Sequence, residues 1–300
     1  MKNILKILPV ILIFGCDNSE IEDTSYKHID NPDAQPYISE VIDFKPAPGQ
    51  FMNKVENDFE AAENIVGNTD QFISLGAFGG EVTFKFDHSI LNKDGNDIAI
   101  YANSFENSSE PGIVMVCQDL NHNGYPDDNE PWYELKGSEY NASTTKHNVS
   151  ITYYRPTEND HIIPYKMEWN GEEQTGEFDL TAIIPYHDQP MFPTCYLTDE
   201  ITFSGTLLAS NVIKEGDIYY NPKYEWGYCD NAGYENEGIL RSADVFDISN
   251  AVDDNGQAVH LIAIDFVKVY TATFDNSGWL GERSTEVFKA ADISLLSDEE

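Results

Sequence analysis

Apolar and polar positions alternate with a period of two along much of the chain after residue 70. Val82, Phe84 and Phe86 alternate with Thr83 and Lys85, so one face of this segment is expected to be buried and the other wet. Segments of the same kind, bounded by turn-forming residues, follow at 97–101, 112–118, 149–154, 162–169, 201–208 and 260–273. The pattern predicts a series of short strands.

A helical period occurs in residues 51–65, where apolar side chains from Phe51 to Ala62 fall on one stripe. One helix does not supply the crossovers that a parallel sheet needs. The pattern therefore predicts an all-β fold, a jelly-roll-like β-sandwich with long loops and one short N-terminal helix. We expect residues 40–295 to form one domain, and the alternative is a division into two domains near residues 170–177.

The first fifteen residues have the features of a bacterial lipoprotein signal peptide. Lys2 and Lys6 flank the start of an apolar run, and the small residue Gly15 precedes Cys16. The run is too short to span a hydrocarbon core of about 30 Å. We expect residues 1–15 to be removed and Cys16 to be lipidated, which would anchor the protein stably in a membrane. An ordinary secretory signal is the alternative.

Residues 16–39 are polar and rich in acidic side chains, which predicts a solvated tether. Acidic residues directly behind a lipidated cysteine resemble the surface-export signal of lipoproteins from the Bacteroidetes group. The resemblance implies an outer-membrane lipoprotein that is exposed at the cell surface.

The net charge of the chain restricts the classes of molecule that the protein can bind. The chain has 53 Asp and Glu against 17 Lys and Arg, a formal net charge of −36, and 41% of its residues are hydrophobic. The hydrophobic share is sufficient for a sizeable core. The negative field repels nucleic-acid phosphates, which excludes nucleic-acid binding, and it attracts cations.

Three cysteines remain once Cys16 is assigned to the lipid, so at most one intrachain disulfide can form. Cys195 and Cys229 lie in loop-like sequence and can pair, whereas Cys117 ends an apolar strand and is predicted to be buried. The sequence has no cysteine and histidine spacing of the kind that binds structural zinc.

Residues 119–130 match the calcium-loop pattern D-x-[DN]-x-[DN]-G-x(5)-E at every specified position. Alternate residues direct oxygens at one centre, Gly124 permits a sharp turn, and the last residue can bind with both oxygens. The predicted ligands are Asp119, Asn121, Asn123, the Tyr125 carbonyl, Asp127 and Glu130, and Asp128 or Glu134 is an alternative for one of the last two. The mixture of carboxylate and amide oxygens favours calcium over magnesium. Pro126 and the strand-like flanks predict a clamp between two strands rather than a helix-loop-helix motif.

The sequence contains a series of motifs at residues 46–51, 74–80, 86–90, 96–101, 109–112, 119–135, 151–156, 226–228, 264–270 and 279–282. Together these motifs resemble a family of Bacteroidetes cell-surface lipoproteins. Members of this family look like calcium-binding jelly rolls of the carbohydrate-module kind, and some carry an added PKD domain. The resemblance implies a non-catalytic surface role. Some relatives are encoded near outer-membrane cobalamin uptake genes, which implies corrinoid capture. The stretch 129–131 is longer here than in the family pattern, which bears on the last calcium ligand.

An aromatic stretch is the candidate ligand site. Tyr224, Trp226 and Tyr228 lie in Gly- and Asn-rich sequence, with Asp230 and Asn231 available for hydrogen bonds. Exposed aromatic faces suit a sugar ring or a flat corrinoid, so we expect a binding platform. The alternative is that these rings pack inside the fold.

The catalytic motifs of serine hydrolases, zinc proteases, P-loop enzymes and dinucleotide-binding enzymes are absent from the sequence. The sequence therefore predicts a non-catalytic module that binds calcium. Its expected role is to capture a glycan or corrinoid at the outer membrane, either by binding this ligand itself or as an accessory protein. The alternatives are a secreted glycan hydrolase and a structural subunit that docks on an outer-membrane transporter. Asp265, inside an apolar run, is predicted to be buried against a cation, an arginine or backbone donors.

Overall fold

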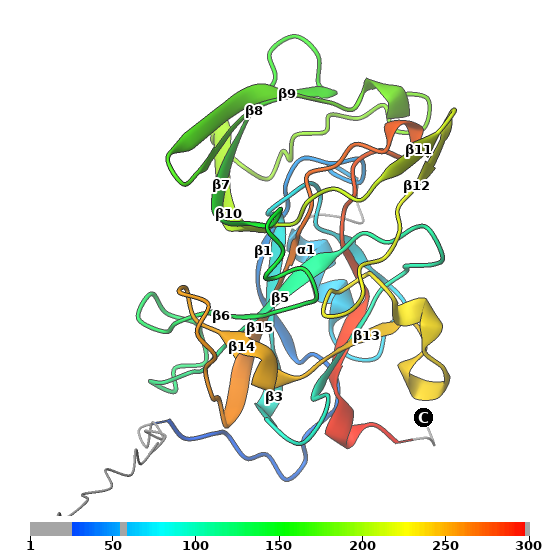
Figure 1. Ribbon diagram of the computed structural model, residues 1–300. Helices are drawn as coiled ribbons and strands as arrows, with labels where there is room; N and C mark the ends of the chain where they lie inside the picture. Colours follow the sequence, from blue (N-terminus) through cyan, green and yellow to red (C-terminus); the bar gives the residue numbers. More distant parts are fainter. Residues whose placement is uncertain (1–25, 55–58, 298–300) are drawn as a thin grey trace, which may run out of the picture.

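The computed structural model describes residues 26–54 and 59–297, so the predicted signal peptide and Cys16 lie outside the described residues. Paired strands form several antiparallel sheets, and the helices are single turns (Figure 1). The prediction of an all-β sandwich is therefore confirmed. Among the described residues, no helix is long and apolar enough to cross a membrane.

The central sheet has the strand order β1-β3-β15-β5-β6-β14. Its strands are β1 (Glu40–Lys45), β3 (Glu81–Leu91), β5 (Gly112–Cys117), β6 (Tyr133–Leu135), β14 (Ala251–Val252) and β15 (Ala263–Thr271). The late strand β15 lies between the early strands β3 and β5, so most pairings in this sheet are distant in sequence. Such pairing of distant strands is typical of Greek-key and jelly-roll connections.

The described residues also form four smaller sheets. The four-stranded sheet β10-β7-β8-β9 comprises β7 (Lys146–Tyr154), β8 (Ile162–Trp169), β9 (Glu172–Asp179) and β10 (Glu200–Leu207). The three-stranded sheet β13-β4-β17 comprises β4 (Ile98–Tyr101), β13 (Ala243–Phe246) and β17 (Lys289–Asp292). The two-stranded pairs are β2 (Ile73–Ser74) with β16 (Glu286–Val287), and β11 (Ile213–Glu215) with β12 (Ile218–Tyr220).

The helical segments are α1 (Phe59–Ala62) and seven 3₁₀ turns in the described residues, η1 (Glu63–Ile65), η2 (Thr181–Ile183), η3 (Gly233–Glu235), η4 (Gly238–Leu240), η5 (Ile248–Asn250), η6 (Gly278–Leu280) and η7 (Ile293–Leu295). Of the predicted helix over residues 51–65, residues 51–54 are not helical, residues 59–65 form α1 and η1, and residues 55–58 lie outside the described residues. Asn53 adopts a left-handed conformation with φ of 59°, which interrupts a right-handed helix. Its side-chain amide donates to the carbonyls of Pro190 and Phe192, so tertiary contacts stabilise the interruption.

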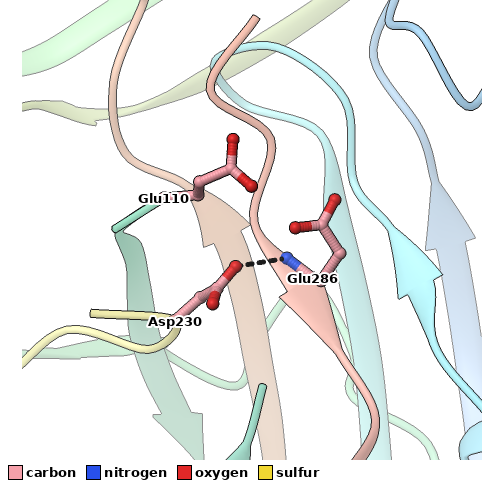
Figure 2. A group of neighbouring side chains, drawn as sticks. All are labelled: Glu110, Asp230 and Glu286. Carbon is pink, nitrogen blue, oxygen red and sulfur yellow. Dashed lines mark hydrogen bonds between the residues drawn. The ribbon is translucent and has the colours of Figure 1, made fainter. Parts of the chain in front are cut away.

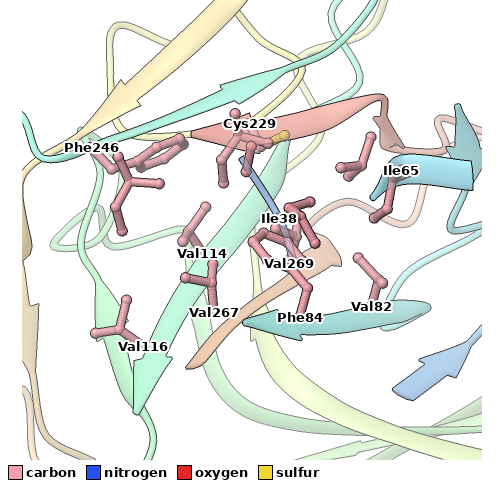
Figure 3. Close-up of a cluster of buried hydrophobic side chains, with 14 of the residues drawn as sticks. Ile38, Ile65, Val82, Phe84, Val114, Val116, Cys229, Phe246, Val267 and Val269 are labelled. Atoms are coloured by element: carbon pink, nitrogen blue, oxygen red, sulfur yellow. The ribbon is translucent and has the colours of Figure 1, made fainter. Parts of the chain in front are cut away.

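The central sheet is buried on both faces because it is the middle layer. Alternate residues of β5 face opposite sides: Val114 and Val116 join the core shared with the three-stranded sheet, and Ile113 joins the core shared with the four-stranded sheet. Figure 3 shows the first of these cores, a single cluster that includes Phe84 of β3, Val267 of β15 and Phe246 of β13. The continuous apolar run of β5 in the sequence reflects this double burial.

Residues 170–177, the predicted alternative boundary between two domains, instead belong to a hairpin. Strands β8 and β9 pair with Trp169 opposite Glu172, so Asn170 and Gly171 form the two-residue turn. Both turn residues have positive φ, 48° and 81°, as a type I′ turn requires. The polar residues after the turn lie on β9, the edge strand of the four-stranded sheet, where they face water.

The tether prediction is wrong for residues 26–39, which pack against the domain. Tyr26 is buried, Ile38 is buried in the central core, and Tyr37 forms a bridge with Ala291 of β17. The Tyr26 hydroxyl donates to Asp265 at 2.8 Å. This hydrogen bond helps to hold the polar stretch 26–39 against the domain, although the stretch contains no long apolar run. The remaining part of the predicted tether, residues 16–25, lies outside the described residues.

The cysteines do not form the disulfide considered from the sequence. Cys229 is fully buried in the core of Figure 3, Cys195 is exposed, and no disulfide joins them in the part of the chain that the structure describes. Cys117 is buried at the end of β5, as its apolar surroundings predict. Burial raises the pKa of the Cys117 thiol to about 12, so it remains a neutral packing group at neutral pH.

Candidate functional site

The 119–130 loop connects β5 to β6, two paired strands of the central sheet. Asp119 and Glu130, the first and last predicted calcium ligands, are both buried. Asp119 accepts the backbone N–H groups of Asn123 at 3.1 Å and Gly124 at 2.7 Å. Gly124 has φ of 82°, which supports the sequence argument that this turn needs a glycine.

Glu130 folds back across the loop. One carboxylate oxygen accepts the N–H of Leu120 at 2.7 Å, and the other accepts the N–H of Asp127 at 3.0 Å. The first and last residues of the loop therefore organise its backbone from opposite ends. Such backbone hydrogen bonds fix the loop in one conformation. The loop would therefore lose little conformational entropy when an ion binds.

The side chains at the third, fifth and ninth positions of the loop meet one another. The side-chain NH₂ groups of Asn121 and Asn123 donate hydrogen bonds to the same carboxylate oxygen of Asp127, at 2.6 and 2.8 Å. The side chains of Tyr125 and Asp128 do not join this group. The Tyr125 ring is exposed and lies under the Lys85 ammonium, and the Asp128 carboxylate is exposed. The structure thus brings the side chains of Asn121, Asn123 and Asp127 together. The side-chain oxygens of Asn121 and Asn123 accept the N–H groups of Asn123 and Tyr125, at 3.0 and 2.8 Å.

Asp265 fixes the start of this loop. The N–H of Asp119 donates to one Asp265 oxygen at 2.8 Å, and the Ser89 hydroxyl donates to the other at 2.5 Å. Asp265 lies where the register between β3 and β15 is interrupted, which directs its side chain toward the loop instead of the core. The buried carboxylate has hydroxyl and backbone donors as partners, one of the options considered from the sequence.

The predicted aromatic platform is not an exposed surface. Tyr224 and Tyr228 are buried in the core under the four-stranded sheet, with their ring centroids 5.4 Å apart, and Trp226 alone of the three rings is exposed, at 44%. The Tyr228 hydroxyl accepts the N–H of Glu139 at 2.9 Å. These tyrosines pack inside because the strand-poor stretch around them lies over the core. For Tyr224 and Tyr228, the alternative given from the sequence, that the rings pack inside the fold, is therefore correct.

The two polar residues of the predicted platform are also internal. Asn231 is fully buried, and its side chain bonds both the N–H and the carbonyl of Tyr224, at 2.7 and 3.0 Å. Its own N–H donates to Asp244, whose pKa burial raises to about 6. Asp230 is fully buried as well. Neither side chain can reach a ligand at the surface, so the platform prediction is wrong for Asp230 and Asn231.

The structure instead presents a cleft that the sequence did not indicate. Its volume is about 580 Å³, within the usual range for small-molecule sites. It lies between the four-stranded sheet and the β6–β14 end of the central sheet. The residues that line it come from strands and loops distant in sequence, among them Glu134, Tyr140, His147, Asp253 and Tyr270.

The cleft combines aromatic, hydrogen-bonding and acidic groups. The rings of Tyr140 and His147 lie 4.6 Å apart, and His147 is also within 3.2 Å of the Thr206 hydroxyl. Thr206 donates to Glu134 at 2.7 Å, and burial raises the pKa of Glu134 to about 7. Aromatic faces beside polar groups suit flat or ring-shaped polar ligands.

Comparison of the chain with models of known protein families and with curated proteins finds no match.

Proposed function

We propose that the chain is a non-catalytic, calcium-binding surface lipoprotein that acts as a ligand-binding or accessory module in nutrient capture at the outer membrane. The observation that carries the calcium part is the organisation of the 119–130 loop. Its buried end residues Asp119 and Glu130 order the backbone, and Asn121, Asn123 and Asp127 converge. Oxygen donors in this order are the calcium-loop arrangement. The lipid anchor at Cys16 and the cell-surface location rest on the N-terminal sequence.

Calcium is expected to stabilise the folded protein through this loop. At free calcium a hundredfold above the dissociation constant, the linkage would be about 2.7 kcal/mol. Thermal unfolding in excess calcium and in chelator should therefore show a higher midpoint with calcium. In Asp119→Ala the part of the shift that belongs to the loop should disappear. Asn129→Ala is the matched control, because this loop residue is exposed and is not a predicted ligand. Equal calcium shifts in wild type and Asp119→Ala would refute the loop assignment.

The cleft is the site that we propose for the glycan or corrinoid ligand. Tyr140 is half-buried in the cleft. Replacing it with alanine is expected to weaken retention by about tenfold, which corresponds to the loss of an aromatic anchor that contributes about 1.4 kcal/mol. Binding of the calcium-loaded protein to immobilised glycans and to cyanocobalamin measures the effect. Trp226→Ala tests the other location, because this exposed ring belongs to the predicted platform. If Trp226→Ala loses binding and Tyr140→Ala retains it, the cleft is not the site.

A glycan hydrolase is the second candidate function, and Glu134 is the observation that favours it. A carboxyl group with a pKa of about 7 in a cleft is suited to general-acid chemistry, and Asp253 and Asp254 line the same cleft. The two functions differ in one variant. In a binding module, Glu134→Gln changes retention only; in a hydrolase, wild type releases sugar products and Glu134→Gln abolishes that release.

A further inference from the structure

Three carboxylates, of which Asp230 and Glu286 are buried and Glu110 is half-buried, meet at a second place, away from the 119–130 loop. Glu110 precedes β5, Asp230 precedes η3, and Glu286 begins β16. One oxygen from each lies within 4.8 Å of the other two. Figure 2 shows the three side chains pointing toward one another from three different segments. We name this group the acidic triad.

The backbone holds the acidic triad in place. The N–H of Glu110 donates to the carbonyl of Asp230 at 2.8 Å, and Gly112 and Cys229 exchange two backbone hydrogen bonds beside it. The N–H of Glu286 donates to the Asp230 carboxylate at 2.9 Å (Figure 2). Asp230 has φ of 54°, a conformation that Asp tolerates better than most residues. The three carboxylates are therefore positioned by main-chain contacts and not by flexible surface loops.

Several oxygens of the acidic triad have no donor. Asp230 Oδ1 and both carboxylate oxygens of Glu286 are buried without a hydrogen-bond partner, and the exposed fractions of these residues are 0% and 2%. A buried charged oxygen without a partner costs several kcal/mol. These unpaired oxygens indicate that the triad lacks a positively charged partner from the protein.

The nearest buried cation of the protein does not supply that partner. Arg283 directs its Nε and Nη2 donors to the Ser109 carbonyl, and its Nη1 donor to Asn211 and Asp275. Arg283 lowers the pKa of Glu110 through space, yet the described residues show no hydrogen bond from it to the triad. An additional cation would satisfy the unpaired oxygens directly.

We propose that Glu110, Asp230 and Glu286 form a buried calcium site that joins the segments before β5, before η3 and at β16. Three carboxylates supply up to six oxygens, within the six to eight that calcium takes. Two oxygens bound to the same calcium ion lie at most about 4.6–5.2 Å apart. The three triad oxygens satisfy this limit, because they lie within 4.8 Å of one another. Zinc prefers nitrogen and sulfur ligands, and magnesium keeps several waters, for which a buried all-carboxylate group is less suited.

The test measures calcium content in a chain whose loop site has been removed, so its result does not depend on the proposed function of that loop. Asp119→Ala is incubated with calcium, passed into calcium-free buffer and analysed for metals by mass spectrometry. We expect one calcium ion per chain, which unfolding in guanidinium releases. Adding Glu286→Gln should remove that ion, because losing a direct ligand weakens affinity by more than the about 10–100-fold typical of outer-shell changes.

Glu282→Gln in the same background is the matched control. Glu282 is also a buried carboxylate, and burial raises its pKa to about 8, but it lies outside the triad and accepts the Gln50 N–H at 2.7 Å. This control should keep the calcium ion. The proposal is overturned if folded Asp119→Ala holds no calcium, if it holds a different metal, or if the Glu286→Gln and Glu282→Gln variants hold equal amounts. If Glu286→Gln fails to fold, the calcium content of folded Asp119→Ala decides the result.

Discussion

Replacing Arg283 with methionine is expected to destabilise the folded protein by about 3–5 kcal/mol, because one partner of a buried ion pair is lost. Arg283 is fully buried, and its Nη1 lies 3.1 Å from Asp275, which is itself 7% exposed. Nε and Nη2 both donate to the Ser109 carbonyl, at 2.9 and 2.6 Å. The variant would leave the Asp275 carboxylate and this carbonyl without their charged donor.

Urea unfolding in excess calcium measures the loss for Arg283→Met. Calcium is kept in excess so that occupancy of the two proposed ion sites does not vary between variants. Arg241→Met is the control, since Arg241 is exposed and its replacement should change stability by no more than about 0.5 kcal/mol. A loss below about 1 kcal/mol for Arg283→Met would show that the buried pair and its carbonyl contacts contribute little.

A double-mutant cycle separates the ion pair from the other contacts of Arg283. Asp275→Asn keeps the size of the side chain and removes its charge. If the pair itself is important, Arg283→Met combined with Asp275→Asn should cost less than the sum of the single changes. Additive costs would assign the effect to the Ser109 carbonyl and the Asn211 side chain instead.

Much of the strand pattern could be predicted from the sequence because each strand carries its own local signal. Strand β8 (Ile162–Trp169) has the predicted bounds, and β10 (Glu200–Leu207) differs by one residue at each end. Strand β9 was missed because its residues are polar on an edge strand, where alternation is weak. The Asn170-Gly171 pair was the available signal, since Asn-Gly favours a two-residue hairpin turn.

The calcium loop is predictable for a related reason. Its candidate ligands lie within twelve consecutive residues, so their spacing along the chain determines how they meet. The acidic triad has no such local pattern, because 120 residues separate Glu110 from Asp230 and 56 separate Asp230 from Glu286. Only the folded pairing of distant segments brings these carboxylates together. The cleft was missed for the same reason, since Glu134, His147 and Tyr270 come from three different strands.

The aromatic stretch shows the limit of composition as evidence. A concentration of tyrosines in loop-like sequence is compatible with a surface platform and with internal packing. Whether Tyr228 lies inside depends on Gly137, a close neighbour of its ring whose added Cβ would lie 2.6 Å from the ring. That contact joins residues 91 positions apart, so sequence spacing alone did not reveal it.

Gly76→Ala is expected to destabilise the protein by roughly 2–5 kcal/mol, the sum of left-handed backbone strain and overpacking. Gly76 has φ of 79°, and a Cβ at this position would lie 2.2 Å from the carbonyl oxygen of Ala47. The segment cannot easily shift to relieve the clash. The N–H of Gly76 donates to the Ser284 hydroxyl at 2.8 Å, and its carbonyl accepts the Thr271 hydroxyl at 2.8 Å.

Gly171→Ala separates the two contributions to this loss. Gly171 has nearly the same φ, 81°, but no atom lies within 4 Å of the position that its Cβ would take. Its replacement should therefore cost only the conformational part, about 1–2 kcal/mol. Urea midpoints of the two variants, compared in excess calcium, measure the difference. Equal shifts would mean that the Ala47 carbonyl moves aside without cost, whereas a larger loss for Gly76→Ala would show that close backbone packing beside Ser284 requires glycine.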